Sequence, residues 1–368
     1  MSEERLVPKL RFSGFDENWS EVKLGDISTF LDNKRVPLKE DDRKQMKGKY
    51  PYYGASGIID YIDDYIFDEE LILMGEDGAN IVTRSSKLIF LAKGKYWVNN
   101  HAHVIKANSD INQYFLSESL ERINYEKYNT GTAQPKLNRD VCQKIKVKIP
   151  EYSEQNKIAS FLVQIDQKIK LLEQKYKNYK NFKKYLMQQI FAQKLRFDFK
   201  DEWKQYKLKE LLTVKSSSIS INQLEDNFGE YPLYGASGFL KNIDFCEMET
   251  DYISIVKDGS GVGNLSYHEK NSSIVNTSQY LLPKKGFDIH FLYYQLQTLN
   301  LLKYVNGSSI PHIYFKDYGI EKVNVPSLSE QQQIGRLFVN TDKSLENINN
   351  SIQVTQEFKK GLLQQMFV

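Results

Sequence analysis

The sequence predicts an α+β fold in which two tandem mixed α/β domains are separated by two long antiparallel helices that form a coiled coil, with an internal pseudo-two-fold repeat. Three observations predict it. The chain of 368 residues repeats itself once. Each repeat ends in a long segment whose apolar residues recur in steps of three and four. Before that segment, each repeat alternates short apolar runs with polar, glycine-rich loops, which is typical of a mixed domain.

The repeat is visible as matching stretches that occur twice in the same order. The longest match aligns residues 150–191 with 326–367 without a gap, with 14 identities in 42 positions. Two further matches are LRFSGFDENWSEVKLGDI (10–27) with LRFDFKDEWKQYKLKELL (195–212), and YPYYGASGII (50–59) with YPLYGASGFL (231–240). An internal repeat decides the architecture, because each copy is expected to adopt the same fold.

The matches divide the chain into four expected segments: a first domain at 1–149, a helical segment at 150–195, a second domain at 196–325 and a helical segment at 326–368. Apolar runs within the domains predict short buried strands at 71–74, 87–92, 252–256 and 278–283. Helices are predicted at 111–123 and 289–304.

Both helical segments carry a heptad seam, which is one row of apolar residues at coiled-coil spacing. Each segment opens with a proline followed by a capping-box-like pattern, Ser-x-x-Asn in the first and Ser-x-x-Gln in the second. A helix of about 36 residues rises about 54 Å. A core helix inside a bundle is the alternative, but two matching seams in one chain can pair with each other. The seam residues are Ile158, Leu162, Ile165, Ile169 and Leu172 in the first segment and Ile334, Phe338, Leu345, Ile348 and Ile352 in the second.

Composition excludes several classes of protein. Hydrophobic residues make up 40% of the chain and aromatic residues 13%, which a disordered chain would not contain. No stretch approaches the roughly 18 apolar residues of a membrane-spanning helix, and Cys142 and Cys246 provide no disulfide framework. We therefore expect a soluble, cytoplasmic protein. The formal net charge of only +3 argues mildly against a nucleic-acid binder.

The order of motifs in each repeat resembles a known family, the specificity (S) subunit of type I restriction–modification systems. The resemblance is carried by TGTAQPKLNRDVCQKIKVKIPEYSEQNKIASFLVQIDQKI (130–169) and NGSSIPHIYFKDYGIEKVNVPSLSEQQQIGRLFVNTDKSL (306–345), and it covers essentially the whole chain. It implies two target-recognition domains, each reading one half of a bipartite DNA sequence, with the coiled coil setting the distance between the halves. It also implies docking of two methyltransferase subunits and, through them, of restriction subunits.

Three pairs of loops, and one pair of short segments before a strand, have side chains suited to contacting DNA. Paired donors and acceptors read base edges, while Lys, Ser, Thr and loop backbone hold phosphates. The alternative for each is an ordered turn or loop that only supports the fold. The candidates are Tyr53, Ser56, Asn80, Asn100, His101, Thr130, Thr132, Gln134 and Lys136 in the first repeat, and Tyr234, Ser237, Lys257, Ser260, Thr277, Ser308, Ser309 and His312 in the second.

The sequence predicts a non-catalytic protein. None of the nine prolines is followed by another, so the (Asp/Asn)-Pro-Pro-aromatic motif of amino-methyltransferases is missing, and no GxxxxGK[ST] phosphate loop occurs. His101-x-His103 lacks further ligands at metal-site spacing, so we expect no metal. S-adenosylmethionine, ATP and Mg are expected on the partner subunits. A coiled-coil protein–protein scaffold with duplicated ligand-binding domains and no DNA recognition remains the alternative, and salt-dependent DNA binding distinguishes the two.

Overall fold

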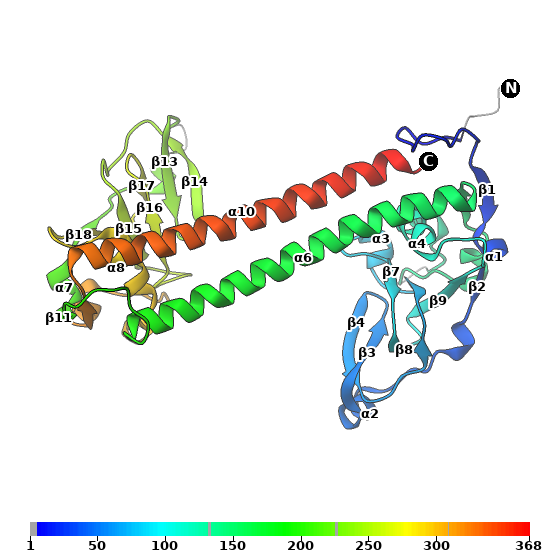
Figure 1. Ribbon diagram of the computed structural model, residues 1–368, viewed down its shortest axis with the longest axis horizontal. Coiled ribbons are helices and arrows are strands. Elements are labelled where there is room, and N and C mark those ends of the chain that lie inside the picture. The colour runs from blue at the N-terminus through cyan, green and yellow to red at the C-terminus, as the bar shows by residue number, and fades with distance from the viewer. Residues whose placement is uncertain (1–5, 132–133, 225–226, 308) are drawn as a thin grey trace. The chain divides into compact units, whose positions relative to one another are not determined.

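The computed structural model describes residues 6–131, 134–224, 227–307 and 309–368, so the candidates Thr132 and Ser308 lie outside the described residues. The chain forms two compact units (Figure 1). The first unit comprises Met1–Leu171 together with Ile352–Val368, and the second comprises Leu172–Ser351. Within the described residues, no helix is long and apolar enough to cross a membrane.

The described residues of the first unit form three β-sheets. One is four-stranded with the order β2-β9-β6-β7, another has the order β4-β3-β8-β5, and β1 pairs with β10. The strands are β1 Ser20–Lys23, β2 Ser28–Phe30, β3 Lys47–Gly54, β4 Gly57–Ile62, β5 Phe67–Asp68, β6 Leu71–Gly75, β7 Ile89–Ala92, β8 Lys95–Val98, β9 Ala102–Ala107 and β10 Lys146–Ile149. The helices are α1 Leu24–Ile27, η1 Asp32–Lys34, α2 Glu40–Gln45, α3 Asn80–Thr83, α4 Gln113–Glu121, η2 Glu126–Tyr128 and α5 Arg139–Cys142.

The second unit repeats this arrangement with sheets ordered β12-β18-β15-β16, β14-β13-β17 and β11-β19. Its strands are β11 Lys204–Lys207, β12 Leu212–Ser216, β13 Tyr231–Gly235, β14 Gly238–Ile243, β15 Tyr252–Val256, β16 Leu265–His268, β17 Ser273–Ile274, β18 Ser278–Pro283 and β19 Lys322–Val325. Its helices are α7 Leu208–Leu211, η3 Ile221–Gln223, α8 Ile289–Gln297, η4 Leu301–Tyr304 and α9 Phe315–Tyr318. The predicted fold class, with its duplicated mixed domains, is confirmed.

The apolar runs predicted the central strands β6, β15 and β18, whereas the central strand β9 was not predicted and the run at 87–92 forms the edge strand β7. Every residue of β6 and of β15 is buried, because neighbouring strands flank each one and the cores of the domains lie against their faces. One difference concerns the helix predicted at 289–304, which ends at Gln297. The Thr298 hydroxyl donates a hydrogen bond to the Gln295 carbonyl (2.7 Å), and the chain then continues into the short helix η4.

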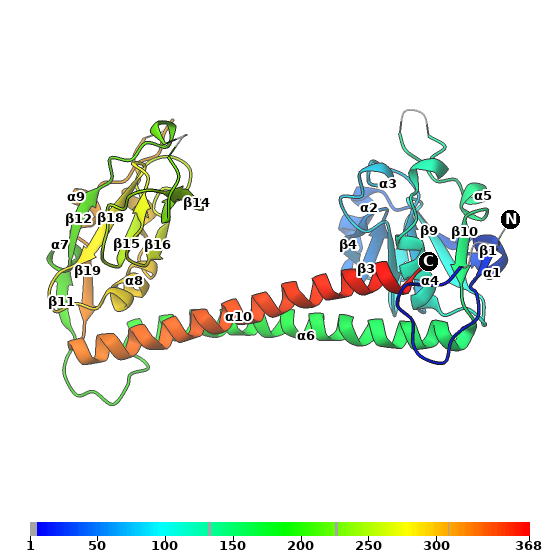
Figure 2. The same ribbon diagram turned by 90° about the horizontal axis from the view of Figure 1, so that it is seen from above.

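Two long helices, α6 (Tyr152–Phe191) and α10 (Leu328–Met366), pass through both units. In the first unit, the end of α10 lies alongside the beginning of α6, as Figures 1 and 2 both show. In the second unit, the beginning of α10 packs against the end of α6, and the Phe191 and Phe338 rings stack with centroids 5.9 Å apart. Each unit therefore contains the first half of one helix paired with the second half of the other, which is an antiparallel pairing.

The predicted seam residues differ in burial along these helices. Five of them are buried nearest the domains, namely Ile158, Leu162, Ile165, Ile334 and Phe338, and Ile348 is also buried. The remaining four, Ile169, Leu172, Leu345 and Ile352, are half-buried. The well-packed parts of each helix are thus those where a domain adds its own side chains to the helix pair.

The Glu-Gln motif at the start of each long helix has a direct structural role. The buried Glu154 carboxylate accepts two hydrogen bonds from the Arg11 guanidinium, at 2.8 and 2.7 Å. Gln155 donates to the Pro150 carbonyl and accepts from the Asn112 backbone amide, which precedes α4. The motif therefore joins the helix start to the N-terminal segment and to α4.

The second unit contains the same arrangement with equivalent residues. Arg196 donates two hydrogen bonds to the buried Glu330 carboxylate, both at 2.8 Å. Gln331 donates to the Pro326 carbonyl and accepts from the Asp288 backbone amide. The arginine and glutamine contacts of the motif are thus the same in both repeats, as the duplication predicts.

Candidate nucleic-acid interface

Three of the predicted loops of the first unit meet in one cluster. The loop after β6 donates from Gly78 N to the Pro135 carbonyl (3.0 Å) and accepts from Leu137 N at the Glu76 carbonyl (2.8 Å). The Glu76 amide in turn donates to the His101 carbonyl (2.9 Å), just before β9. Loops that are far apart in the sequence are therefore held together by backbone hydrogen bonds.

The charges in this first loop cluster are paired. The Glu76 carboxylate accepts a 2.6 Å hydrogen bond from Arg35 and lies 3.4 Å from the Lys136 ammonium. Asp77 lies 2.7 Å from Nδ1 of the half-exposed His101 side chain. These pairs orient the loop side chains while leaving Lys136 and His101 accessible to a ligand.

Behind the loops lies His103, a residue that the sequence analysis considered only as a possible metal ligand. Its Nδ1 lies 2.7 Å from Asp32 Oδ2, and its Nε2 lies 2.7 Å from the Leu137 carbonyl oxygen. Both neighbours are acceptors, so both ring nitrogens must carry a proton. Burial alone would lower the pKa of His103, but the hydrogen bond and negative charge of Asp32, together with the nearby Cys142, outweigh it and raise the pKa to about 10.

The YGASG motif forms the turn between β3 and β4. Gly57 has φ +120°, a conformation that favours glycine, and Gly54 pairs with Gly57 across the two-residue turn. The turn packs against the loop cluster: a Cβ on Gly75 would lie 2.6 Å from the Ala55 carbonyl oxygen. The exposed Ser56 therefore stands at the edge of the cluster.

The other candidate side chains of the first unit differ in how free they are to contact a ligand. Tyr53 is half-buried and stacks on Phe90 (5.7 Å), so its ring belongs to the packing of the domain. The Asn80 side chain donates to the Ser86 carbonyl and accepts from the Ser86 amide, which closes its own loop. Three others are exposed, namely Asn100, Thr130 and Gln134.

The second unit builds an equivalent loop cluster with the same backbone bonds. Gly259 N donates to the Pro311 carbonyl (2.8 Å), Ile313 N donates to the Lys257 carbonyl (2.9 Å), and Lys257 N donates to the Thr277 carbonyl (2.9 Å). Each of these bonds has its counterpart in the first unit, between the residues that the alignment of the two repeats makes equivalent. The two clusters thus share a frame, by which we mean this set of backbone hydrogen bonds between the loops.

The side chains on this second frame are different. Lys257 occupies the position of Glu76 and lies 3.1 Å from Asp258, and the His312 ring lies against Tyr314 (5.0 Å). Tyr234 is half-buried against His268. The remaining candidates are exposed: Ser237, Ser260, Thr277 and Ser309. The two clusters therefore present different side-chain chemistry on the same backbone arrangement.

The pair of His103 and Asp32 also has a counterpart that the sequence analysis missed. Gln279 and Ser216 face each other across β18 and β12, and Gln279 Nε2 donates to Ser216 Oγ (3.3 Å). Gln279 Oε1 is buried and has no hydrogen-bond partner among the described residues. In the alignment of the two repeats, Gln279 lies 176 residues after His103 and Ser216 lies 184 residues after Asp32. These are the same offsets as in the match of 150–191 with 326–367 and around the tryptophan shared by 10–27 and 195–212, so the pairing could have been found from the sequence.

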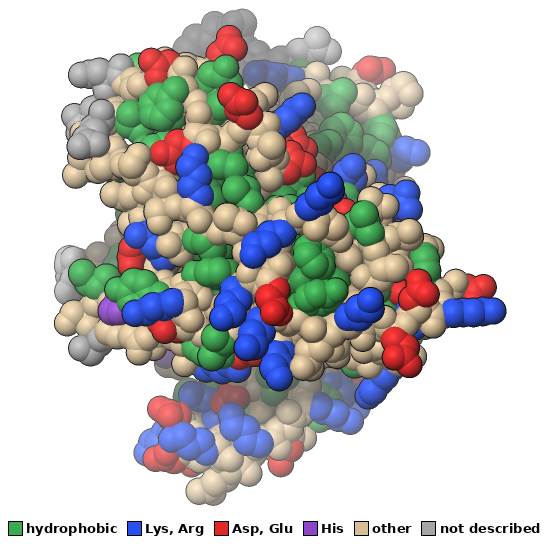
Figure 3. Space-filling view, turned by 90° about the vertical axis from the view of Figure 1, so that its left-hand side faces the viewer, with side chains coloured by type: hydrophobic (Ala, Val, Ile, Leu, Met, Phe, Trp, Pro, Cys, Tyr) green, Lys and Arg blue, Asp and Glu red, His purple; other side chains and the backbone are tan. Residues whose placement is uncertain are grey.

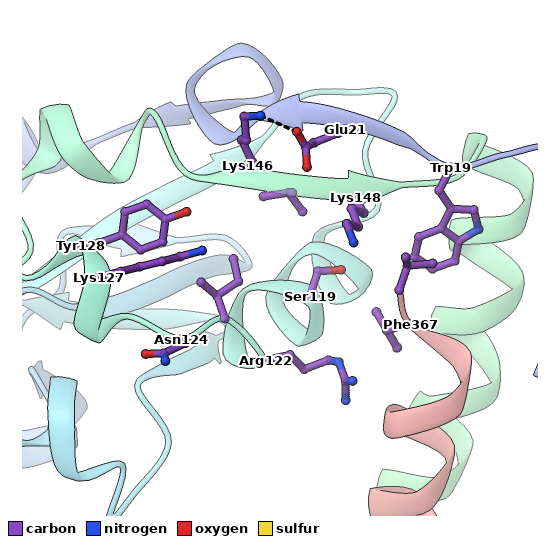
Figure 4. A pocket seen from close by; sticks show the side chains of 13 residues that line it. Trp19, Glu21, Ser119, Arg122, Asn124, Lys127, Tyr128, Lys146, Lys148 and Phe367 are labelled. Carbon is purple, nitrogen blue, oxygen red and sulfur yellow. Dashed lines mark hydrogen bonds and ion pairs between the residues drawn. The ribbon is translucent and has the colours of Figure 1, made fainter. Parts of the chain in front are cut away.

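A cationic cavity of about 440 Å³ lies in the first unit between β10, α4 and the end of α10. Figure 4 shows Lys127 and Lys148 extending their ammonium groups into it, with Arg122 at its edge and Lys146 paired with Glu21. The second unit has a groove of about 620 Å³ that is also lined by lysines. The equivalent lining residues are Ser119, Arg122, Phe367 and Val368 in the first unit and Gln295, Thr298, Phe191 and Ala192 in the second.

Basic residues also gather on one face of the second unit. Lys207 and Lys322 are direct partners in the pairing of β11 with β19, where like charges repel. Figure 3 looks onto this end of the unit and shows several Lys or Arg side chains near the centre of the face with hydrophobic side chains beside them. The modest net charge of the chain is thus unevenly distributed. In the part of the chain that the structure describes, no three His, Cys, Asp or Glu residues gather as metal ligands would.

These features define a class of protein: a duplicated recognition protein whose two loop clusters share a frame but differ in side chains, and whose long helices join the domains. The sequence profile of the Type I restriction modification DNA specificity domain matches residues 16–180 and 200–356. The chain belongs to this family, and it is a type I specificity subunit with two DNA specificity domains. Specificity subunits are not the catalytic components, in agreement with the sequence prediction.

Similar proteins come from several organisms. The chain is 22% identical to a type I restriction enzyme specificity subunit of Methanocaldococcus jannaschii, over 94% of this chain and 89% of that protein. It is 32% identical to a specificity subunit of Haemophilus influenzae, but this match spans only 44% of the chain and 40% of that relative. A crystal structure of an S subunit from M. genitalium has the same fold, with a TM-score of 0.73 at 19% identity over 98% of this chain and 99% of that one.

Proposed function

We propose that the two loop clusters each read one half of a bipartite double-stranded DNA sequence. The observation that carries this proposal is the shared frame with different side chains: three loops are held by equivalent backbone hydrogen bonds in both units, yet Lys257 replaces Glu76. A common frame gives both domains the same approach to DNA, while exposed donors and acceptors at its edge specify different bases.

In the first cluster, the side chains most available for base contacts are those of Asn100 and Gln134. Amides of this kind pair bidentately with adenine. Lys136 can reach guanine or phosphate, and Thr130 and Ser56 supply hydroxyls at the edge of the cluster. In the second cluster, Lys257, Ser260, Thr277 and Ser309 supply the corresponding donors, with His312 beside them.

The long helices support the docking of two methyltransferase subunits, one on each unit. Phe182 on α6 and Phe358 on α10 are equivalent in the repeat, and they are 52% and 56% exposed. Aromatic side chains are enriched in protein–protein interfaces, and these two occupy the same position in both repeats. The lysine-lined groove of the second unit lies beside Phe182 on α6, and the cationic cavity of the first unit lies at the end of α10, so the docking surfaces suit acidic, amphipathic segments of the partner.

Catalysis in this proposal is the work of the partners. S-adenosylmethionine is expected on the methyltransferase subunits, and ATP and Mg on restriction subunits that assemble through them. The exposed ends of the loop clusters then bind DNA weakly in the isolated chain, because a net charge of +3 provides little electrostatic attraction.

Substituting Gln134 or Lys136 with alanine is expected to weaken discrimination at one half-site about 10-fold, because each good base contact contributes about 1–3 kcal/mol. The measurement is the sequence specificity of DNA methylation by the complex with its methyltransferase subunit. Lys106→Ala, in an exposed lysine paired with Glu69 outside the cluster, is the control. Loss of partner binding with unchanged half-site preference would contradict the assignment, and DNA affinity that does not fall as salt rises would favour the protein scaffold.

Replacing Phe182 or Phe358 with serine is expected to remove one methyltransferase subunit from the complex, and the double substitution to remove both. A buried phenylalanine contributes about 1.5–3 kcal/mol, so each contact should weaken about 10- to 100-fold. Native mass spectrometry of the complex measures the stoichiometry. Leu171→Ser is the matched control, because Leu171 is also exposed on α6 but is not repeated in α10. A 2:1 complex that persists in the double variant would exclude this docking surface.

A further inference from the structure

We infer that His103, together with Asp32, is a positioning residue for base reading in the first unit. Through the Leu137 carbonyl, His103 fixes segment 134–137, which carries Gln134 and Lys136. In the second unit the equivalent positions hold an uncharged pair, Gln279 and Ser216. This inference rests on the proposed function and names residues that act behind the loops rather than on the DNA.

The geometry of His103 makes it a bridge between β9 and the segment. Its imidazolium donates one hydrogen bond to Asp32 and one to the Leu137 carbonyl, and its side chain is 2% exposed. Asp32 is held in turn by the Val104 amide (2.9 Å) and lies 3.7 Å from Arg35. The segment therefore has a fixed anchor on the central sheet immediately after Lys136.

The same network extends to the charged side chain that faces the segment. Glu76 Oε2 lies 3.7 Å from His103 Nδ1 and accepts from Arg35, while Glu76 Oε1 faces Lys136. His103 thus takes part in placing Lys136 both through the backbone of the segment and through the carboxylate that Lys136 pairs with. Displacing the imidazolium should move the ends of both candidate side chains.

The second unit shows that the bridge is not a general requirement of the fold. Ser216 and Gln279 stand at the positions equivalent to Asp32 and His103, and one 3.3 Å hydrogen bond joins them. The backbone bonds around segment 310–313 are nevertheless all present. The backbone frame of the second unit therefore forms with a neutral pair at these positions, and the charged pair of the first unit adds an anchor for segment 134–137.

The test uses the full chain in complex with its methyltransferase subunit, and the second half-site is the internal control. His103→Gln leaves the Asp32 carboxylate without its imidazolium, and it should lower discrimination at the first half-site about 10- to 100-fold, the range expected for hydrogen bonds to charged groups. Discrimination at the second half-site and the stoichiometry of the complex should not change. Mapping of methylated sites by the variant complexes gives both values.

The double variant D32S/H103Q installs the pair of the second unit in the first. It removes both buried charges, so it is expected to assemble even if H103Q alone does not, and to recover at least part of the discrimination that H103Q loses. Unchanged discrimination at the first half-site in both variants would overturn the positioning role. A double variant that assembles but discriminates no better than H103Q would overturn the equivalence of the two pairs. Neither result would affect the proposed DNA reading, which the wild-type complex tests.

Discussion

Replacing Arg11 with alanine is expected to lower the free energy of unfolding by about 2–4 kcal/mol. The substitution leaves the Glu154 carboxylate, whose side chain is fully buried, without the guanidinium that donates two hydrogen bonds to it. Removing one partner of a buried ion pair is costly, because the remaining charge keeps the cost of burial without its compensation. Equilibrium denaturation in urea, followed by far-UV circular dichroism, measures the change.

The control separates this buried pair from an ordinary surface pair. Lys106→Ala breaks an exposed contact with Glu69 and should change stability by less than about 0.5 kcal/mol. The double variant R11A/E154Q removes the charge that R11A leaves behind, so it should be less destabilised than the sum of the single substitutions. An R11A protein as stable as the wild type would mean that Arg11 is not needed to compensate Glu154.

Raising the pH from 6 towards 10.5 should destabilise the first unit through His103 by an amount on the order of 4 kcal/mol. The pKa of His103 is about 10 in the folded chain, above its ordinary value of 6.5. The folded state therefore binds this proton more tightly than the unfolded state, so the stabilisation is complete below pH 6.5 and is lost as pH rises through 10. The groups that face the imidazole are Asp32, Glu76 and the Cys142 thiol.

Lysines and tyrosines also titrate near pH 10, so the comparison must isolate His103. The D32S/H103Q variant lacks the titrating pair, and the difference between its denaturation midpoint and that of the wild type should shrink as pH rises from 7 to 10. Parallel pH profiles for the two proteins would show that His103 does not carry this dependence. The second unit has the neutral Gln279 at this position, so the effect is expected in one unit only.

The architecture was largely predictable from the sequence because the repeat and the heptad seam are strong, regular signals. The uninterrupted match of 150–191 with 326–367 indicated both long helices, and the apolar runs indicated the buried strands β6 and β15. The helix predicted at 289–304 was too long. Hydrophobic spacing continues beyond Gln297, but Thr298 bonds back to the preceding turn and the chain leaves the helix there.

The loop clusters were predictable only as a set of residue types. The sequence indicated polar, glycine-rich loops, but not that Gly78, Glu76 and His101 would be joined to segment 134–137 by backbone bonds. Such contacts depend on tertiary pairing between distant loops, for which composition has no signature. His103 illustrates the difficulty: the sequence offered it only as half of a His-x-His pair, which was rejected as a metal site, whereas its two acceptors come from residues 32 and 137.

The exchange of helix halves between the two units has a consequence for synthesis on the ribosome. Trp19 and Phe115 of the first unit pack against Phe367, so that part of the core cannot close until the last residues have emerged. At about 5–20 residues per second, the nascent first unit waits roughly 10–40 s after residue 171 before residues 352–368 have been synthesised. During that interval its apolar surface needs protection, and a truncated chain would keep it exposed. The first unit can therefore finish folding only after the ribosome has translated the whole of the second unit.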